Sequence, residues 1–246
     1  RGYDVSELAE QCIFEEVAYL LLYGELPTQA QLDEYKATLK QLRDLPQALK
    51  DVLERIPQDA HPMDVLRTGC SMLGNLEPED SFEQQLDKTN RMLSAFPAII
   101  NYWYRFSHEG VKIDCVTDAE TIGGHFLQLL KGEKPSELHE HVMNVSLILY
   151  AEHEFNASTF TARVCASTLS DIFSCITGAI GSLRGPLHGG ANEAAMELIE
   201  SFDSPEAAEA GLMGMLERKD KIMGFGHAIY SDSDPRNVII KQWAEK

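Results

Sequence analysis

Apolar residues recur at three- and four-residue spacing along most of the chain, a pattern that predicts a succession of helices. From Leu8 to Leu22 the pattern runs without a break until Gly24, a residue type that commonly ends a helix. No segment alternates apolar and polar residues clearly enough to predict a strand, so the expected fold class is all-α. Helices are expected over 8–22, 62–74, 80–106, 117–131, 136–150, 157–183, 193–202 and 204–217, with another beginning at Pro235.

The predicted helix over 157–183 differs from the others because small residues recur along it. Small side chains allow another backbone to come close, and Ile172, Phe173, Ile176 and Ile180 add apolar surface around them. We therefore expect this helix to be buried on nearly all sides. A central helix within one subunit and a helix at a two-fold interface would both have this pattern.

Composition and charge restrict the class of protein. The chain has 246 residues and a formal net charge of −18, which argues against nucleic acid and anionic membrane surfaces as partners. Its five cysteines are scattered and include no Cys-x-x-Cys pair, so we expect reduced thiols and a cytoplasmic location. No apolar run approaches the length of a membrane span. The chain opens at Arg1 rather than at Met, so the true N-terminus is expected to be missing.

A sharp break in the helical pattern falls at residues 185–190, and His188 lies on it. Pro186 cannot continue a preceding helix, while Gly189 and Gly190 permit backbone approaches that other residues resist. The helical pattern resumes at Asn192. Because a helix N-terminus disfavours an imidazolium, we expect His188 to be neutral and to donate a hydrogen bond.

A second break carries His227 and leads into a strong helix start. Asp234 is suited to the N-cap and Pro235 to the first helical position, and we expect Arg236, with free backbone N–H groups, to face a cleft. Two loop histidines and an arginine suit a small polyanion with a carbonyl to polarise. Taken alone, however, a histidine in a glycine-rich loop is more often a turn residue. The pair His139 and His141 is rejected as a metal site because positions i and i+2 point to different faces of a helix.

Several segments in order resemble the citrate synthase family, and its 2-methylcitrate synthase branch in particular. The segments are Arg1-Gly2-Tyr3-Asp4, His61-Pro62-Met63, His153-Glu154-Phe155-Asn156-Ala157-Ser158-Thr159, Gly185-Pro186-Leu187-His188-Gly189-Gly190-Ala191-Asn192-Glu193, Gly224-Phe225-Gly226-His227 and Asp234-Pro235-Arg236. This resemblance covers essentially the whole chain. For His61 itself we expect only a helix-capping role.

The resemblance implies a two-domain helical fold and a homodimer. Residues 1–189 would form the large domain, with the oxaloacetate site and the dimer interface in the helix over 157–183. Residues 190–246 would form part of a small domain that closes over coenzyme A (CoA) and continues beyond Lys246. Oxaloacetate would bind first and draw the small domain inward, with 190–246 more mobile than 1–189 in its absence.

The implied reaction is that of a 2-methylcitrate synthase: an acyl-CoA condenses with oxaloacetate and the thioester is then hydrolysed. The catalytic residues would be His188 and His227, and oxaloacetate would be bound by His153 and Arg236. The resemblance places CoA on a loop formed by Lys221, Ile222, Met223, Gly224, Phe225 and Gly226. It implies no metal and no cofactor, since the CoA thioester is a substrate.

The identity of the acyl donor and of the base is less determined. The residues of the loops that carry His227 and Arg236 resemble 2-methylcitrate synthases more than citrate synthases, which favours propionyl-CoA. The alternative donor is acetyl-CoA, which would make the protein a citrate synthase. No aspartate of the chain matches the family's catalytic aspartate, so we expect that residue outside the chain and the chain alone to be inactive.

A non-catalytic helical protein would explain the composition but not the matched histidine loops. A Cys/His hydrolase would need a cysteine at a turn, whereas Cys165 and Cys175 fall within a predicted helix.

Overall fold

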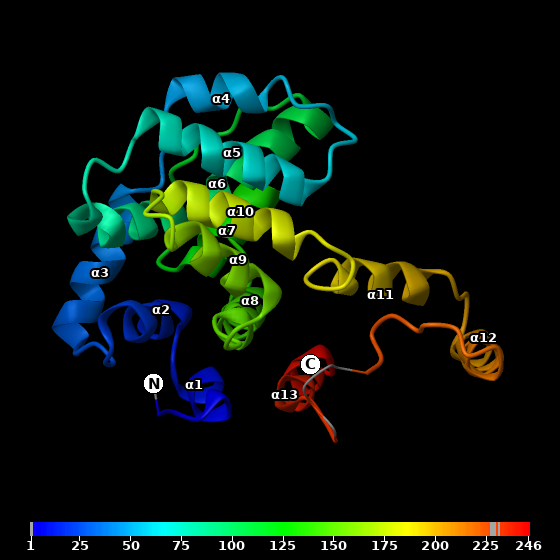
Figure 1. Cartoon of the computed structure of the whole chain (residues 1–246). Helices are drawn as coiled ribbons and strands as arrows, with labels where there is room; N and C mark the ends of the chain where they lie inside the picture. Colours follow the sequence, from blue (N-terminus) through cyan, green and yellow to red (C-terminus); the bar gives the residue numbers. More distant parts are fainter. Residues whose placement is uncertain (1, 227–229, 231) are drawn as a thin grey trace.

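The computed structural model describes residues 2–226, 230 and 232–246, in which the regular elements are all helices and no strand is present (Figure 1). The all-α prediction is thus confirmed for the described residues; the predicted catalytic His227 lies outside them. The elements are α1 (Val5–Gln11), α2 (Phe14–Tyr23), α3 (Gln29–Gln41), α4 (Gln47–Leu53), α5 (Pro62–Leu76), η1 (Phe82–Gln84), α6 (Gln85–Glu109), α7 (Ile122–Lys131), α8 (Glu137–Tyr150), α9 (Ala157–Ala166), α10 (Ile172–Leu183), α11 (Ala191–Glu200), α12 (Pro205–Glu217) and α13 (Pro235–Ala244).

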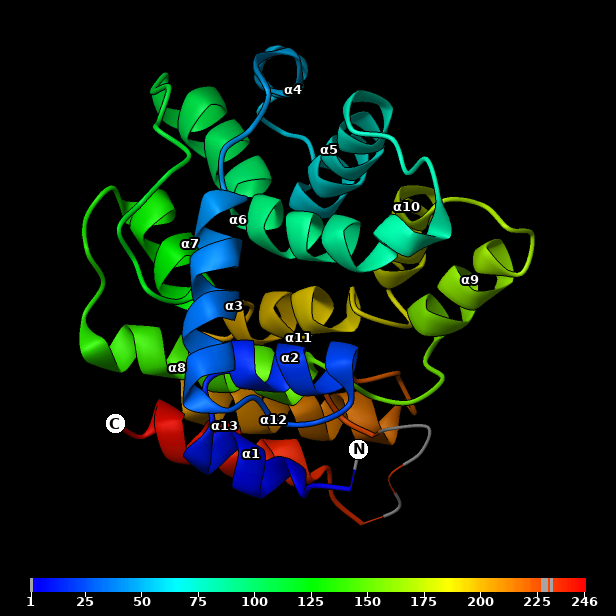
Figure 2. The same ribbon diagram turned by 90° about the vertical axis from the view of Figure 1, so that its left-hand side faces the viewer.

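The main core lies where α4, α5, α6 and α10 pack together. Trp103 of α6 and Phe173 of α10 are among its largest fully buried side chains. The approach of α5 to α10 depends on Gly74, because a Cβ atom there would lie 2.6 Å from Cβ of Phe173. Figure 2 shows α9 at the edge of the molecule beside α10.

A second apolar cluster joins the two ends of the chain. Ile239, Ile240 and Trp243 of α13 pack with Val145 of α8 and Ala9 of α1. Figure 1 shows α11 and α12 leading away from the main body and α13 returning near α1. Neither α11 nor α12 contains a buried residue. The proposed boundary between 1–189 and 190–246 remains a prediction, and any such division must allow for the contact of α13 with α1 and α8.

The predicted single helix over 157–183 is wrong, because the segment forms two helices, α9 and α10. Leu169 has a φ of 63°, a left-handed conformation that cannot continue a right-handed helix. Asp171 then caps α10, with its side chain accepting a hydrogen bond of 2.9 Å from the Ser174 N–H. Burial on nearly all sides is also wrong for this chain by itself: α9 buries no residue, and Phe160 is 61% exposed.

Helix boundaries differ from those expected at other places too, and two of these differences have a clear side-chain cause. The segment 8–22 contains the end of α1 and all but the last residue of α2, since the side chain of Glu16 accepts the Ile13 N–H at 2.8 Å and starts a new helix. Helix α7 begins at Ile122 rather than near residue 117. The reason is Arg43, whose guanidinium binds the carbonyl oxygens of Thr117 (3.1 Å) and Ala119 (2.8 Å) and so holds them outside a helical ladder.

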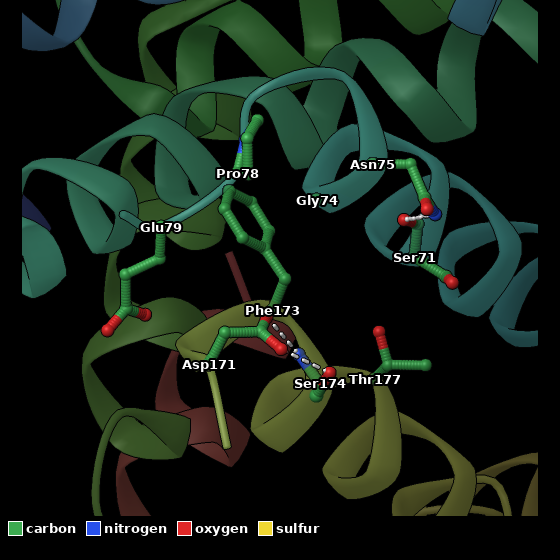
Figure 3. A pocket seen from close by; sticks show the side chains of 9 residues that line it. All are labelled: Ser71, Gly74, Asn75, Pro78, Glu79, Asp171, Phe173, Ser174 and Thr177. Atoms are coloured by element: carbon green, nitrogen blue, oxygen red, sulfur yellow. Dashed lines mark hydrogen bonds between the residues drawn. The ribbon is translucent and has the colours of Figure 1, made fainter. Parts of the chain in front are cut away.

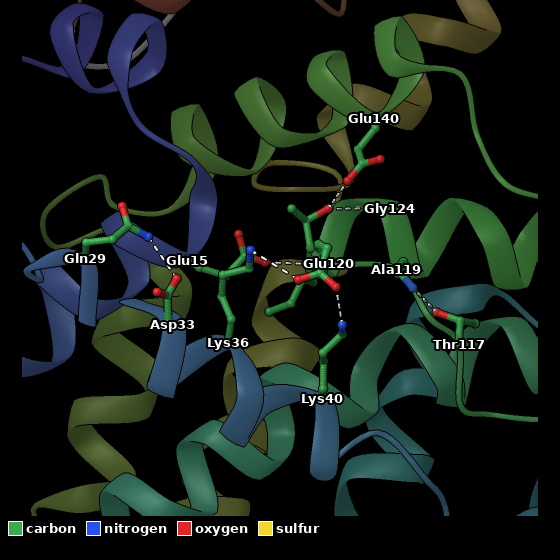
Figure 4. A network of polar contacts seen from close by, with 12 residues as sticks. Glu15, Gln29, Asp33, Lys36, Lys40, Thr117, Ala119, Glu120, Gly124 and Glu140 are labelled. Atoms are coloured by element: carbon green, nitrogen blue, oxygen red, sulfur yellow. Dashed lines mark hydrogen bonds and ion pairs between the residues drawn. The ribbon is translucent and has the colours of Figure 1, made fainter. Parts of the chain in front are cut away.

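The same region holds a polar network, partly buried, that connects α2 and α3 to the start of α7 (Figure 4). Glu15 is 1% exposed, and its carboxylate accepts the Ile122 N–H at 2.6 Å. Burial raises the pKa of Glu15, while the Ile122 N–H and the charges of Lys36 and Arg43 act in the opposite direction. His125 is fully buried, and its Nδ1 lies 2.9 Å from Oγ1 of Thr117. The loop before α7 is therefore held by side chains distant in sequence.

Candidate functional site

The loop that carries His188 is a tight link between α10 and α11. The Gly190 N–H donates to the carbonyl oxygens of Leu183 and Gly185, both at 3.1 Å. A Cβ at Gly189 would lie 2.7 Å from the Leu183 carbonyl oxygen, and one at Gly190 would lie 2.6 Å from that of Arg184. Both positions therefore require glycine, as the sequence pattern suggested.

The imidazole of His188 is held by Ser158 in the first turn of α9. Nε2 of His188 lies 3.2 Å from the Ser158 backbone nitrogen and 2.8 Å from Ser158 Oγ. Because a backbone N–H can only donate, Nε2 acts as the acceptor, which places the proton of a neutral ring on Nδ1. Loss of water around the partly buried ring lowers the pKa of His188. The neutral, hydrogen-bond-donating state expected from the sequence is therefore favoured, and its donor is Nδ1–H.

His153 lies in the short connection between α8 and α9. Its Nε2 is 2.9 Å from the hydroxyl of Tyr230, and the two rings meet edge to face with centroids 5.6 Å apart. Three residues later Asn156 caps α9, accepting the Thr159 N–H at 3.0 Å. The connection that carries His153 and the loop that carries His188 thus meet at the N-terminal turn of α9.

Arg236 is paired with the residue that caps its own helix. Nε of Arg236 lies 2.9 Å and 3.0 Å from the two carboxylate oxygens of Asp234, and Nη2 lies 2.6 Å from Oδ2. Asp234 also accepts the Arg236 backbone N–H at 3.0 Å, so the expectation of a free N–H at Arg236 is wrong. The Asp234 carboxylate raises the pKa of Arg236, which therefore stays fully charged.

Tyr150, at the end of α8, connects this arginine to α11. The guanidinium of Arg236 lies over the Tyr150 ring, 5.7 Å from its centroid. The Tyr150 hydroxyl accepts a hydrogen bond of 3.2 Å from the Asn192 side chain. These contacts span 86 and 42 positions, and the sequence offers no signal for them beyond an aromatic residue at the end of an apolar helix. Tyr150 was missed for that reason.

His61 contacts the helix that follows the His188 loop. The capping role predicted for His61 is confirmed. Nδ1 of His61 accepts the Met63 N–H at 3.1 Å at the start of α5. Its Nε2 lies 2.8 Å from the carboxylate of Glu193 in α11. The first turn of α11 is therefore anchored on both sides, through Asn192 to α8 and through Glu193 to α5.

The predicted CoA loop, 221–226, is an irregular turn. Gly224 and Gly226 have φ values of 90° and 79°, and Phe225 is 69% exposed. A Cβ at Gly224 would lie 3.1 Å from that of Ala195, so the loop passes close to α11. Within the described residues, no hydrogen bond connects it to His188, His153 or Arg236.

A surface pocket lies elsewhere, between α5 and α10 (Figure 3). Figure 3 shows hydroxyl, amide and carboxylate groups around it, together with the ring of Phe173. None of the candidate site residues lines this pocket. Its lining residues are Ser71, Gly74, Asn75, Pro78, Glu79, Asp171, Phe173, Ser174 and Thr177.

The described residues contain neither a metal-binding cluster nor a helix able to cross a membrane. No group of three or more His, Cys, Asp or Glu side chains is arranged to hold a metal ion in this part of the chain. None of the helices described here has both the length and the apolar character needed to cross a membrane.

Comparison with known proteins places these loops in a family. The family model for the C-terminal domain of citrate synthase matches residues 1–246. The chain is 73% identical to a 2-methylcitrate synthase of Shewanella oneidensis over 246 residues, which cover 100% of the chain and 66% of that protein. It is 40% identical to a citrate synthase of Heyndrickxia coagulans, covering 98% of the chain and 66% of the relative. The chain thus spans about two thirds of the length of these relatives.

Solved structures agree with the sequence relatives. The citrate synthase of Thermotoga maritima is 38% identical and superposes with a TM-score of 0.87, covering 100% of the chain and 65% of that protein. The citrate synthase of Thermoplasma acidophilum, solved as a ternary complex with carboxymethyl coenzyme A and oxaloacetate, is 31% identical with a TM-score of 0.91, covering 99% and 65%. By sequence and by fold, this chain belongs to the citrate synthase family.

Proposed function

We propose that the full-length protein containing this chain is a 2-methylcitrate synthase, which condenses propionyl-CoA with oxaloacetate, hydrolyses the thioester and releases CoA. The observation that carries the proposal is the 73% identity over the whole chain to a 2-methylcitrate synthase, in a chain that retains both histidine loops. The matched segments include the two residues, His188 and Arg236, whose surroundings are described above.

In the proposed mechanism, His188 acts on the acyl-CoA. A carboxylate removes a proton from the carbon next to the thioester carbonyl, and His188 donates a hydrogen bond to the enolate oxygen that develops. A neutral imidazole with its proton on Nδ1 suits this role, and both the lowered pKa of His188 and its contact with the Ser158 N–H favour that state. We assign no residue of this chain as the carboxylate base.

Oxaloacetate, the acceptor, would be bound by His153 and Arg236. The enolate carbon attacks the ketone carbon, and His227 donates a hydrogen bond to the ketone oxygen as it becomes an alkoxide. Water then cleaves the C–S bond, and the sulfur leaves as the CoA thiol. The 221–226 loop would meet CoA through its peptide groups. Charge supports Arg236 in this role, because its raised pKa keeps it cationic beside a dianionic substrate.

The proposed assembly is a homodimer that closes on its substrates. The exposed apolar side chains Phe160, Val164 and Leu169 around α9 support an interface on that side of the subunit. Closure would be driven by oxaloacetate, which binds first and completes the CoA site. Reciprocity then requires that a CoA analogue tighten oxaloacetate binding by the same factor that oxaloacetate tightens binding of the analogue.

Acetyl-CoA is the second candidate donor, favoured by relatives such as the H. coagulans citrate synthase. The two donors differ by one methylene, which an apolar pocket discriminates by only about 1–3 kcal/mol. The decisive experiment is to measure kcat/KM of the full-length protein for both thioesters with oxaloacetate saturating. A higher value for propionyl-CoA supports the proposal, and a higher value for acetyl-CoA would replace it with citrate synthesis. Failure to turn over either thioester would favour a non-catalytic protein.

A further inference from the structure

The ion pair between Arg236 and Asp234 uses only one edge of the guanidinium. Asp234 occupies Nε and Nη2, at distances of 2.6–3.0 Å. A guanidinium carries five N–H donors, and its outer edge, formed by Nη1 and the second N–H of Nη2, can bind another carboxylate with two hydrogen bonds. Within the described residues no hydrogen bond is made by Nη1. Arg236 therefore keeps one complete carboxylate-binding edge.

Two other features restrict the movement of that guanidinium. It lies over the ring of Tyr150, and Tyr150 is itself held by Asn192. Asp234 cannot swing away easily, because the same carboxylate accepts the Arg236 backbone N–H and caps α13. The side chains of both members of the pair are largely shielded, with 22% and 26% exposed. An arginine side chain that is free in solution loses considerable rotamer entropy on binding, and here the pairing with Asp234 removes part of that loss before any ligand arrives.

We propose that Asp234 is a positioning residue for Arg236: it holds the guanidinium by its inner edge so that the outer edge is ready for a carboxylate of the substrate. The inference rests on the proposed function, in which Arg236 binds oxaloacetate. It adds a residue that touches no substrate atom and acts through the arginine. The negative charge of Asp234 repels a dianionic substrate. We expect the gain from orienting Arg236 to exceed that repulsion.

Asparagine at position 234 separates orientation from helix capping. Asn is as good an N-cap as Asp, so Asp234→Asn keeps the start of α13 but removes the charged fork. Asp4→Asn is the matched control, because Asp4 caps α1 through the N–H two residues on, Ser6, in the same way and contacts no arginine among the described residues. Arg236→Lys keeps the positive charge but cannot be held by two parallel hydrogen bonds.

The experiment is calorimetric titration of the full-length protein with oxaloacetate, followed by steady-state kinetics. We expect Asp234→Asn to raise the Kd and KM for oxaloacetate about 3- to 10-fold with little change in kcat, and Asp4→Asn to change neither. In the Arg236→Lys background, adding Asp234→Asn should not weaken binding further, because no fork remains to be lost. That non-additivity is a result a purely structural role would not give.

Three outcomes would overturn the proposal. Tighter oxaloacetate binding by Asp234→Asn would mean that Asp234 competes with the substrate rather than positioning the arginine. Equal affinity of the wild type and Asp234→Asn, with the wild type binding well, would refute the positioning role and leave the proposed function intact. A wild-type protein that does not bind oxaloacetate would refute both.

Discussion

His125 makes the stability of this chain sensitive to mild acid. The side chain is fully buried beside Arg43, and burial together with that positive charge lowers the pKa of His125 to about 3. In the unfolded chain its pKa returns to about 6.5. Below pH 6.5 the unfolded state therefore binds a proton that the folded state does not, so stability falls as the pH drops until it passes the folded-state pKa.

The size of the effect follows from the two pKa values. Integrating proton binding between pH 7 and pH 5 gives a loss of about 2 kcal/mol from His125 alone, a large share of the roughly 5–15 kcal/mol that stabilises a typical protein. If the free energy of unfolding falls by about 3 kcal/mol per molar urea, the urea concentration at the unfolding midpoint should be about 0.7 M lower at pH 5 than at pH 7. Glu15 has the opposite sign, since its raised pKa makes the folded state the better proton binder.

The assay is urea unfolding at pH 7 and pH 5, at one protein concentration, for the wild type and for His125→Asn. Asparagine retains a polar group near Thr117 but has no proton to gain. We expect the variant to be less stable at pH 7 but to lose about 2 kcal/mol less than the wild type on acidification. Glu15 is present in both proteins and cancels. His139→Asn, at an exposed position of α8, serves as the control and should behave as the wild type. Equal losses in the wild type and His125→Asn would refute the reasoning.

Three further predictions concern packing, catalysis and assembly. Gly74→Ala should destabilise the chain by about 1–3 kcal/mol in urea unfolding, because its Cβ would lie 2.6 Å from Cβ of Phe173, whereas Gly214→Ala on exposed α12 should be neutral or stabilising by up to about 1 kcal/mol. In the full-length protein, His188→Ala should lower kcat strongly with a smaller change in KM for oxaloacetate, and His153→Ala should mainly raise that KM; near-normal turnover by His188→Ala would contradict its role. Sedimentation of the full-length protein at micromolar concentration should give a dimer, and a monomer would count against an interface around α9.

Where the sequence predicted this structure well, the deciding interactions lie within a few residues of each other. The caps at His61 and Asp234 both form as expected, because each joins a side chain to a backbone N–H two positions away. Gly24 ends α2 in a left-handed conformation for an equally local reason. The glycines after His188 are likewise determined by the close carbonyl oxygens of the preceding turn.

The points where helices break were predicted less well. A turn whose residues resemble those of the flanking helices does not interrupt the apolar periodicity. The segment 157–183 remains rich in small and apolar residues through Leu169, where the chain reverses into α10. The start of α7 was placed too early because its delay depends on Arg43, some 75 positions before. A short window does not contain Arg43, and the cap at Asp171, although local, does not interrupt the apolar periodicity.

The candidate site shows the same division. The sequence alone determined which loops carry His153, His188 and Arg236, since those loops are set by proline, glycine and capping residues. Only the tertiary structure decided that Ser158 holds His188, that Tyr150 lies under Arg236, and that Arg236 is already paired with Asp234. The contacts of Ser158 and Tyr150 join positions far apart in the chain. The third is local, but the sequence did not reveal that the guanidinium turns back on its own cap, because rotamers are chosen by the packing around them.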